Sequence, residues 1–131
     1  MEDFIKDYVE MNIDEMKQVK ETWQIHLKIF TRKLRNIANI PESKENRWEL
    51  KQLEAHYSFC IESIKDIMAI YSNLINLAED CDLDEDFFLK EIKKVQRIHK
   101  SLREENNKKT IQAVANKYSY SNNHKHTSLN I

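Results

Sequence analysis

Apolar side chains recur at seven-residue spacing through the first two thirds of the chain. Between residues 4 and 38, one row consists of Val9, Met16, Trp23, Phe30 and Ile37, and a second of Ile13, Leu27 and Leu34. In the following segment the two rows consist of Leu50, Tyr57, Ile64, Tyr71 and Ala78, and of Leu53, Cys60, Ile67 and Leu74. This spacing places each row on one face of an α-helix. The pattern predicts long amphipathic helices over about residues 2–38 and 44–79.

The second predicted helix carries a third apolar row, Ile61, Met68 and Ile75. A helix with one neighbour needs only a narrow apolar stripe, whereas a wide stripe indicates contact on two sides. We therefore expect this helix to lie at the centre of the packing. Before it, Pro41 disfavours helix at Ile40, and Ser43 is a suitable cap for the helix that follows.

A third helix is predicted over about residues 83–105 from the apolar positions Phe88, Ile92, Val95 and Leu102. Its seam stops at residues 103–109, REENNKK, and resumes out of phase at Ile111, Val114 and Tyr118. Two alternatives follow. Either this helix continues past its partners, or it breaks and a short fourth helix covers about residues 108–118.

Glycine is absent from the 131 residues, and proline occurs once. Glycine supplies the positive φ angles of phosphate-binding loops, nucleophile elbows and two-residue hairpins. Its absence excludes Walker A loops, Rossmann fingerprints, the α/β-hydrolase elbow and most β architectures. We expect an all-α fold, an elongated up-down-up three-helix bundle, in one domain over residues 1–118 with a polar flexible tail over residues 119–131.

Charge and hydropathy indicate a soluble chain. The formal net charge is −1, with 33% charged and 40% hydrophobic residues, which suits helices with large solvated faces. No apolar run approaches the roughly 20 residues of a membrane span, and the N-terminus, MEDFIKDYVE, is acidic where a signal peptide is basic and then apolar. We expect a cytoplasmic protein without a membrane partner. Cys60 and Cys81 are then expected to stay reduced, as a core thiol and a loop thiol.

The stretch DCDLDEDFFLKE, residues 80–91, has acidic residues at positions 1, 3, 5, 7 and 12 of a calcium loop. Such a loop also needs glycine at position 6, where this chain has Glu85, and Phe88 belongs to the apolar seam. Helix capping accounts for the stretch without either conflict. Either Asp82 is the cap, with Glu85 three residues later, or Asp84 is the cap, with Leu83 and Phe88 as a hydrophobic staple. The sequence therefore favours a helix N-terminus over a calcium site.

Other metal and catalytic patterns are incomplete. No histidine follows a glutamate by three positions, which excludes the di-iron and zincin motifs, and no arginine precedes a histidine at the spacing of helical HEPN nucleases. If the first hairpin folds about residue 41, His26 comes level with His56, and with Cys60 they would offer three zinc ligands. Because both histidines flank the seam, we interpret them as rim residues beside a core cysteine. We expect no metal and no cofactor.

The two tryptophans have different settings. Trp23 lies on the seam of the first helix and is expected to pack in the core. Trp48 lies beside Arg47 in the first turn of the second helix. We expect it to cover the end of the core, because large aromatic side chains near helix ends mostly do so; the alternative is an exposed anchor for a partner.

Charge is distributed unevenly along the predicted bundle. If the first and third helices are parallel, one end collects Glu2, Asp3, Asp7, Glu10, Glu79, Asp80, Asp82, Asp84, Glu85 and Asp86. The other end becomes a basic tip, and the candidate partner-binding residues there are Lys28, Arg32, Lys33, Arg35, Arg97, Lys100, Arg103, Lys108 and Lys109. Solvated faces with interhelical salt bridges would also account for the pattern. In the functional alternative, the basic tip meets phosphates or an acidic protein surface.

These features favour a small non-enzymatic helical interaction protein, an adaptor, inhibitor or regulatory factor, whose partner is most readily a protein. The alternative is a nucleic-acid-associated accessory subunit whose cations bind phosphates without sequence preference. A homo-dimer stays open as well, because the wide apolar stripe and the stray Ile25, Ile29 and Ile70 could seal one.

Overall fold

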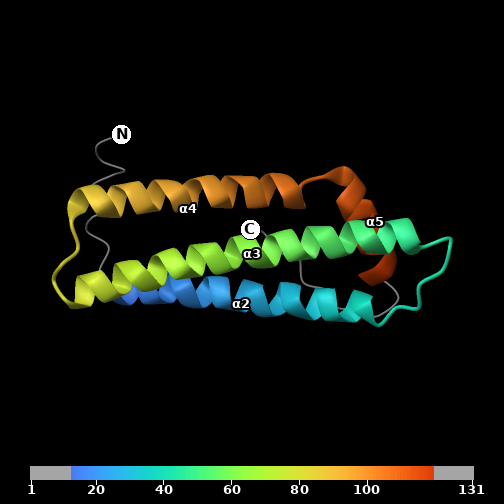
Figure 1. Ribbon diagram of the computed structural model, residues 1–131, viewed down its shortest axis with the longest axis horizontal. Coiled ribbons are helices and arrows are strands. Elements are labelled where there is room, and N and C mark those ends of the chain that lie inside the picture. The colour runs from blue at the N-terminus through green and yellow to red at the C-terminus, as the bar shows by residue number, and fades with distance from the viewer. Residues whose placement is uncertain (1–12, 120–131) are drawn as a thin grey trace.

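A computed structural model describes residues 13–119 of the chain. Nearly all of this part is helical: α2 (Ile13–Ala38), α3 (Arg47–Glu79), α4 (Glu85–Asn106) and α5 (Lys109–Ser119). The three long helices run up, down and up along an elongated bundle, and the short α5 turns across it near one end (Figure 1). The predicted all-α bundle is therefore confirmed. Residues 2–12 of the first predicted helix, Val9 among them, and residues 120–131 of the predicted tail lie outside the described part.

The predicted apolar rows form the core. Met16, Trp23, Phe30 and Ile37 of α2 are buried, and Ile13, Leu27 and Leu34 pack half-buried beside them. In α3, the row Leu53, Cys60, Ile67 and Leu74 is fully enclosed. In α4, Phe88, Ile92, Val95 and Leu102 are buried. Each seam thus faces a neighbouring helix, as its spacing predicts.

The helix α3 is the centre of the bundle, as its wide stripe predicts. It contacts α2, α4 and α5, and Ile61 and Ile75 of its third apolar row are buried. With 33 residues it is about 50 Å long at ~1.5 Å per residue, whereas α4 has 22 residues. As a result α4 ends well short of the α2–α3 turn, and α5 covers the part of α3 that α4 leaves free (Figure 1).

The turn between α2 and α3 is organised by Ser43 and Asn46. The Ser43 Oγ accepts a hydrogen bond from the Asn46 backbone N–H at 3.3 Å, and the Asn46 Oδ1 accepts one from the Ser43 N–H at 2.7 Å. The Asn46 amide group also donates to the Pro41 carbonyl at 3.0 Å. Ser43 therefore caps a preliminary turn over residues 44–46, and the regular helix begins at Arg47.

The acidic stretch after α3 is a turn followed by a helix N-terminus. Asp84 is the N-cap of α4, with φ −86° and ψ 139°, and its carboxylate accepts a hydrogen bond from the Phe87 N–H at 3.3 Å. Residues 85–91 are helical, so capping is confirmed, with Asp84 as the cap rather than Asp82. Before this cap, Cys81 adopts a left-handed backbone conformation with φ 59°, and the Asp82 N–H donates to the Leu77 carbonyl at 2.8 Å. Cys81 thus holds the helix-ending position that glycine usually occupies.

The third predicted helix breaks, which settles the alternatives for residues 103–109. α4 ends at Asn106, and α5 begins at Lys109 after the two-residue link Asn107–Lys108. The Asn106 side chain donates to the Leu102 carbonyl at 2.8 Å, and the Gln112 side chain donates to the Asn106 carbonyl at 3.1 Å. These bonds fix the corner at which the chain changes direction.

Candidate partner-binding surface

The candidate basic residues form two rows on the outer sides of α2 and α4. Lys28, Arg32 and Arg35 are exposed and follow one another at spacings of four and three, which places them on one face of α2. Arg97 and Lys100 make the corresponding row on α4, which Lys93 extends. Both rows point away from the buried side chains of their helices, and α3 lies between the two helices (Figure 1).

These residues do not converge on one tip. Because α4 ends beside His56 and Cys60 of α3, its basic row lies along the middle of the bundle. The end formed by the α2–α3 turn instead carries the mixed charges Glu42, Lys44, Glu45 and Arg47, and Arg47 is paired with Glu42 at 2.8 Å. Lys108 and Lys109 lie at the α4–α5 corner. The basic surface thus consists of two rows, one on α2 and one on α4, and of the two lysines at the α4–α5 corner.

Most of the candidate cations form no ion pair with another residue of the described part of the chain. Within residues 13–119, no ion pair involves Lys28, Arg32, Arg35, Arg97, Lys100, Arg103 or Lys109. Two of the nine are engaged. Lys108 pairs with Glu105 at 2.8 Å, and the half-buried Lys33 places its ammonium 5.4 Å from the centre of the Phe30 ring. Burial lowers the pKa of Lys33. The unpaired cations keep their charge available for a partner.

The opposite charge gathers at the α3–α4 turn. Its exposed acidic residues are Glu79, Asp80, Asp82, Asp84, Glu85 and Asp86. At this end of the bundle, the Lys17 Nζ of α2 lies 3.9 Å from the Glu79 Oε2 of α3. The predicted Glu2, Asp3, Asp7 and Glu10 lie outside the described residues. The described charges therefore place an acidic tip at one end and the basic rows further along.

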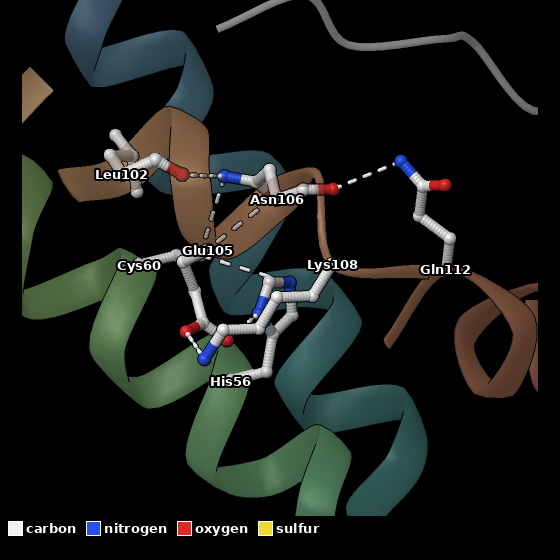
Figure 2. A network of polar contacts seen from close by, with 7 residues as sticks. All are labelled: His56, Cys60, Leu102, Glu105, Asn106, Lys108 and Gln112. Carbon is white, nitrogen blue, oxygen red and sulfur yellow. Dashed lines mark hydrogen bonds and ion pairs between the residues drawn. The ribbon is translucent and has the colours of Figure 1, made fainter. Parts of the chain in front are cut away.

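A partly buried polar cluster occupies the α4–α5 corner, where Glu105, Asn106 and Lys108 approach the buried His56 and Cys60 of α3 (Figure 2). The His56 Nδ1 lies 2.7 Å from the Glu105 Oε2, and the Cys60 Sγ lies 3.9 Å from the His56 Nε2. Burial alone would raise the pKa of Glu105, but the bonds from Lys108 and His56 lower it. Because a carboxylate can only accept, His56 donates through Nδ1, and its Nε2 is then the acceptor nitrogen that faces the Cys60 sulfur. The Cys60 thiol also lies 4.0 Å from the Asn106 Oδ1, to which it can donate.

The order cysteine, histidine, glutamate has the connectivity of a nucleophile triad. A thiol attacks as its thiolate, and burial raises the pKa of Cys60 to about 12. Its side chain is also completely enclosed. The arrangement therefore supports a structural polar network rather than a catalytic centre.

The half-buried His26 agrees with the interpretation as a rim residue, whereas His56 does not. His56 is 5% exposed and is no rim residue, because Glu105 supplies a partner that lets it be buried. His26 does not come level with His56, because Phe30 packs against Tyr57 across the hairpin; His26 lies instead beside Trp23, which also contacts His99 of α4. The core position of Cys60 is confirmed, as is the exposed turn position of Cys81. Sequence reasoning missed Glu105 and Asn106, whose signal was the interruption of the apolar seam.

Trp48 is 59% exposed, so the expectation that it covers the end of the core is wrong. α5 takes that role: Ile111 and Val114 are buried, and Tyr118 packs against the core. The Tyr118 hydroxyl donates to the Glu49 Oε1 at 2.7 Å, and Lys117 pairs with the same oxygen at 2.9 Å. With the start of α3 covered by α5, the Trp48 ring remains at the surface.

A shallow groove of about 420 Å³ separates the end of α2 from the start of α3. Leu34, Ile37 and Leu50 contribute apolar side chains to its wall, and Lys51 and Glu54 contribute charged ones. None of the nine candidate cations lines it. The groove and the basic rows are therefore separate features of the surface.

In the described part of the chain, no helix combines the length and apolarity needed to cross a membrane. Over the same residues, no three histidine, cysteine, aspartate or glutamate side chains are grouped to hold a metal ion. No family model, curated protein or solved structure matches the chain.

Proposed function

We propose that this chain is a small non-enzymatic helical interaction protein, an adaptor, inhibitor or regulatory factor that binds an acidic protein surface through its basic rows. The observation that carries the proposal is the set of exposed cations on α2 and α4 that take part in no ion pair within the described residues. Unpaired like charges along one helix repel one another, and an acidic partner relieves that repulsion. The enclosed Cys60 thiol supports a non-catalytic role.

Site-specific photo-crosslinking tests this proposal in cells that produce the protein. A benzophenone amino acid replaces Lys28 in one variant and Lys100 in another, and the matched control replaces the exposed Asp66 of α3. We expect one adduct from both basic-row positions, absent from the Asp66 position and lost when Arg32, Arg35 and Arg97 are together replaced by glutamate. Adducts that survive this triple charge reversal would contradict the proposal.

Nucleic acid is the second candidate partner, because the same unpaired cations could bind phosphates. Fluorescence anisotropy with labelled single-stranded and double-stranded DNA and RNA tests it at about 50 and 200 mM salt. A partner held by three phosphates of a DNA duplex would bind about 40-fold more weakly at the higher salt concentration. Binding with this salt dependence, lost in the triple charge reversal, would favour nucleic acid over a protein partner. Absence of binding at low salt would leave the protein partner.

A further inference from the structure

The three histidines in the described part all lie where α4 and its corner meet the α2–α3 hairpin. His56 of α3 contacts Glu105 at the end of α4, and His26 of α2 and His99 of α4 both lie against Trp23. We propose that α4 from His99 onward, together with α5, is a proton-released segment: it packs on α2 and α3 while these histidines are neutral and detaches when they bind protons. This inference is independent of the proposed function.

The surroundings of His26 and His99, which both lie against Trp23, have no place for an additional proton. The Nδ1 of His26 and the Nε2 of His99 are buried and have no hydrogen-bond partner in the described part. A neutral imidazole needs only one donor site, so an unpaired lone pair is tolerated, whereas imidazolium would place an N–H there without an acceptor. The Trp23 ring centre is 5.6 Å from that of His26 and 5.2 Å from that of His99. Arg103 and the other histidine add positive charge near His99.

The surroundings of His56 also favour its neutral form. Lys33 faces it from α2, Cys60 and Tyr57 from α3, Glu105 from α4 and Lys108 from the link. Glu105 favours imidazolium, but its carboxylate is shared with Lys108, and Lys33 adds a second cation. A proton on Nε2 would face only the Cys60 sulfur, a weak acceptor, at 3.9 Å.

The segment has few other attachments to the bundle. α5 has 11 residues, which is shorter than an isolated helix needs to be stable in water, so its helical form depends on contact with α3. That contact consists of the buried Ile111 and Val114 and of the Glu49 carboxylate with Lys117 and Tyr118. The first half of α4 is held separately by the buried Phe88, Ile92 and Val95. Detachment can therefore begin at His99 and leave the remaining bundle in place.

The direction of the pH effect follows from the pKa values of the three histidines. Burial is the main cause that lowers each of them below the ordinary value of 6.5, and for His56 the Glu105 bond only partly offsets it. Once the segment detaches, His26, His56 and His99 all lose the burial that lowers their pKa values, so the open form of the protein binds more protons than the packed form. Packing is thus fully favoured above pH ~6.5 and weakens as the pH falls toward the lowered values. Each histidine that gains a proton only on detachment raises the opening constant by up to about tenfold per pH unit.

Detachment would uncover side chains that the packed form encloses. Leu53 and Tyr57 of α3 and Leu102 of α4 are buried beside the corner. Acidification would therefore convert a closed surface into an exposed apolar face, which can bind an apolar probe.

Native-state hydrogen exchange of the full chain, read by mass spectrometry between pH 7.5 and 5.5 and corrected for intrinsic exchange rates, tests the proposal. We expect the opening constant of residues 99–119 to rise as the pH falls while the centre of α3 stays protected. In the variant carrying H26Q, H56Q and H99Q the opening constant should be independent of pH over this range. The matched control carries H124Q and H126Q, the other two histidines of the chain, and should behave like the unsubstituted protein.

Three results would overturn the proposal. The first is an unchanged pH dependence in the triple variant, and the second is simultaneous opening of α2 and α3, which indicates global unfolding. The third is available even if the triple variant does not fold: NMR titration of the unsubstituted protein showing His26, His56 and His99 at or above their ordinary pKa.

Discussion

The hydroxyl of Tyr118 lies 2.7 Å from the Oε1 of Glu49, a residue 69 positions earlier in the chain. This hydrogen bond joins the end of α5 to the first turn of α3. Burial and the nearby Glu49 carboxylate together raise the pKa of Tyr118 to about 12. The pKa of Tyr118 therefore shows whether α5 is in contact with α3.

Replacement of Glu49 by glutamine should lower the pKa of Tyr118, because an amide accepts a hydrogen bond but carries no charge. The pKa should fall from about 12 toward the ordinary value of about 10. NMR titration with ring-labelled tyrosine measures it. Tyr57, whose pKa of about 12 is caused mainly by burial, is the internal control and should not change. An unchanged Tyr118 would contradict the contact between α5 and α3.

Replacement of Cys81 by glycine should stabilise the protein by about 0.5–1 kcal/mol, because glycine adopts the left-handed conformation of this position without steric cost. Urea unfolding measures the change in the free energy of unfolding. Cys81→Ala is the matched control, since alanine keeps the Cβ and loses the thiol. Equal stabilisation by both substitutions would assign the effect to the thiol instead of the backbone.

Replacement of Asp84 by alanine should cost about 1 kcal/mol, because the Phe87 N–H loses its acceptor at the start of α4. Thermal or urea unfolding measures it against Asp82→Ala, for which we expect less than about 0.5 kcal/mol. Calcium should not change the stability of either variant. A larger loss at Asp82 than at Asp84 would show that the cap lies two residues earlier.

The two tryptophans should respond very differently to truncation. Trp23→Ala should destabilise the protein by about 3–5 kcal/mol, because it removes a buried core side chain. Trp48→Ala should change the free energy of unfolding by less than about 0.5 kcal/mol. Unfolding curves of both variants test this contrast. A loss of several kcal/mol at Trp48 would mean that its ring is covered in solution, for instance by a second copy of the chain.

The thiols of Cys60 and Cys81 should also differ in their rates of chemical labelling. At pH 8 an aromatic disulfide reagent should label the exposed Cys81 quickly and leave Cys60 unmodified, because Cys60 is enclosed and burial raises its pKa to about 12. Addition of denaturant should expose Cys60 and allow the reagent to label it. The Cys81→Ala variant gives the rate for Cys60 alone. Rapid labelling of that variant without denaturant would contradict the buried thiol and reopen a nucleophilic role.

Seven-residue spacing was enough to predict the core residues. Each helix buries one face, and the apolar residues of that face recur along the sequence with the period of the helix. Cys60, Trp23 and Leu53 are buried where the pattern predicts. The break after Asn106 was visible only as an interrupted seam, since polar residues are compatible with both a solvated helix and a corner. Its position matters most for the candidate site, because an α4 ending at Asn106 leaves the basic rows along the bundle instead of at a tip.

Contacts between different helices were harder to predict than the buried face of each helix. The sequence predicts a rim position for His56, because its partner Glu105 is 49 positions away in the chain. In the structure the His56 Nδ1 lies 2.7 Å from the Glu105 Oε2, which allows His56 to be buried. The register of the α2–α3 hairpin sets Phe30 against Tyr57, so His26 does not face His56, and the packing of α4 places His99 against Trp23. No periodicity within one helix contains that information, because register depends on the length of the turn and on the fit of side chains across it.

The central place of α3 has a consequence for how the chain reaches its native state. α2 and α4 are its neighbours in the sequence as well as in the bundle, so most of the core assembles through short loops at a small entropic cost. The contact of α5 with the start of α3 spans a much longer stretch of chain. We therefore expect a folding transition state built from α2, α3 and α4, with α5 joining after the barrier.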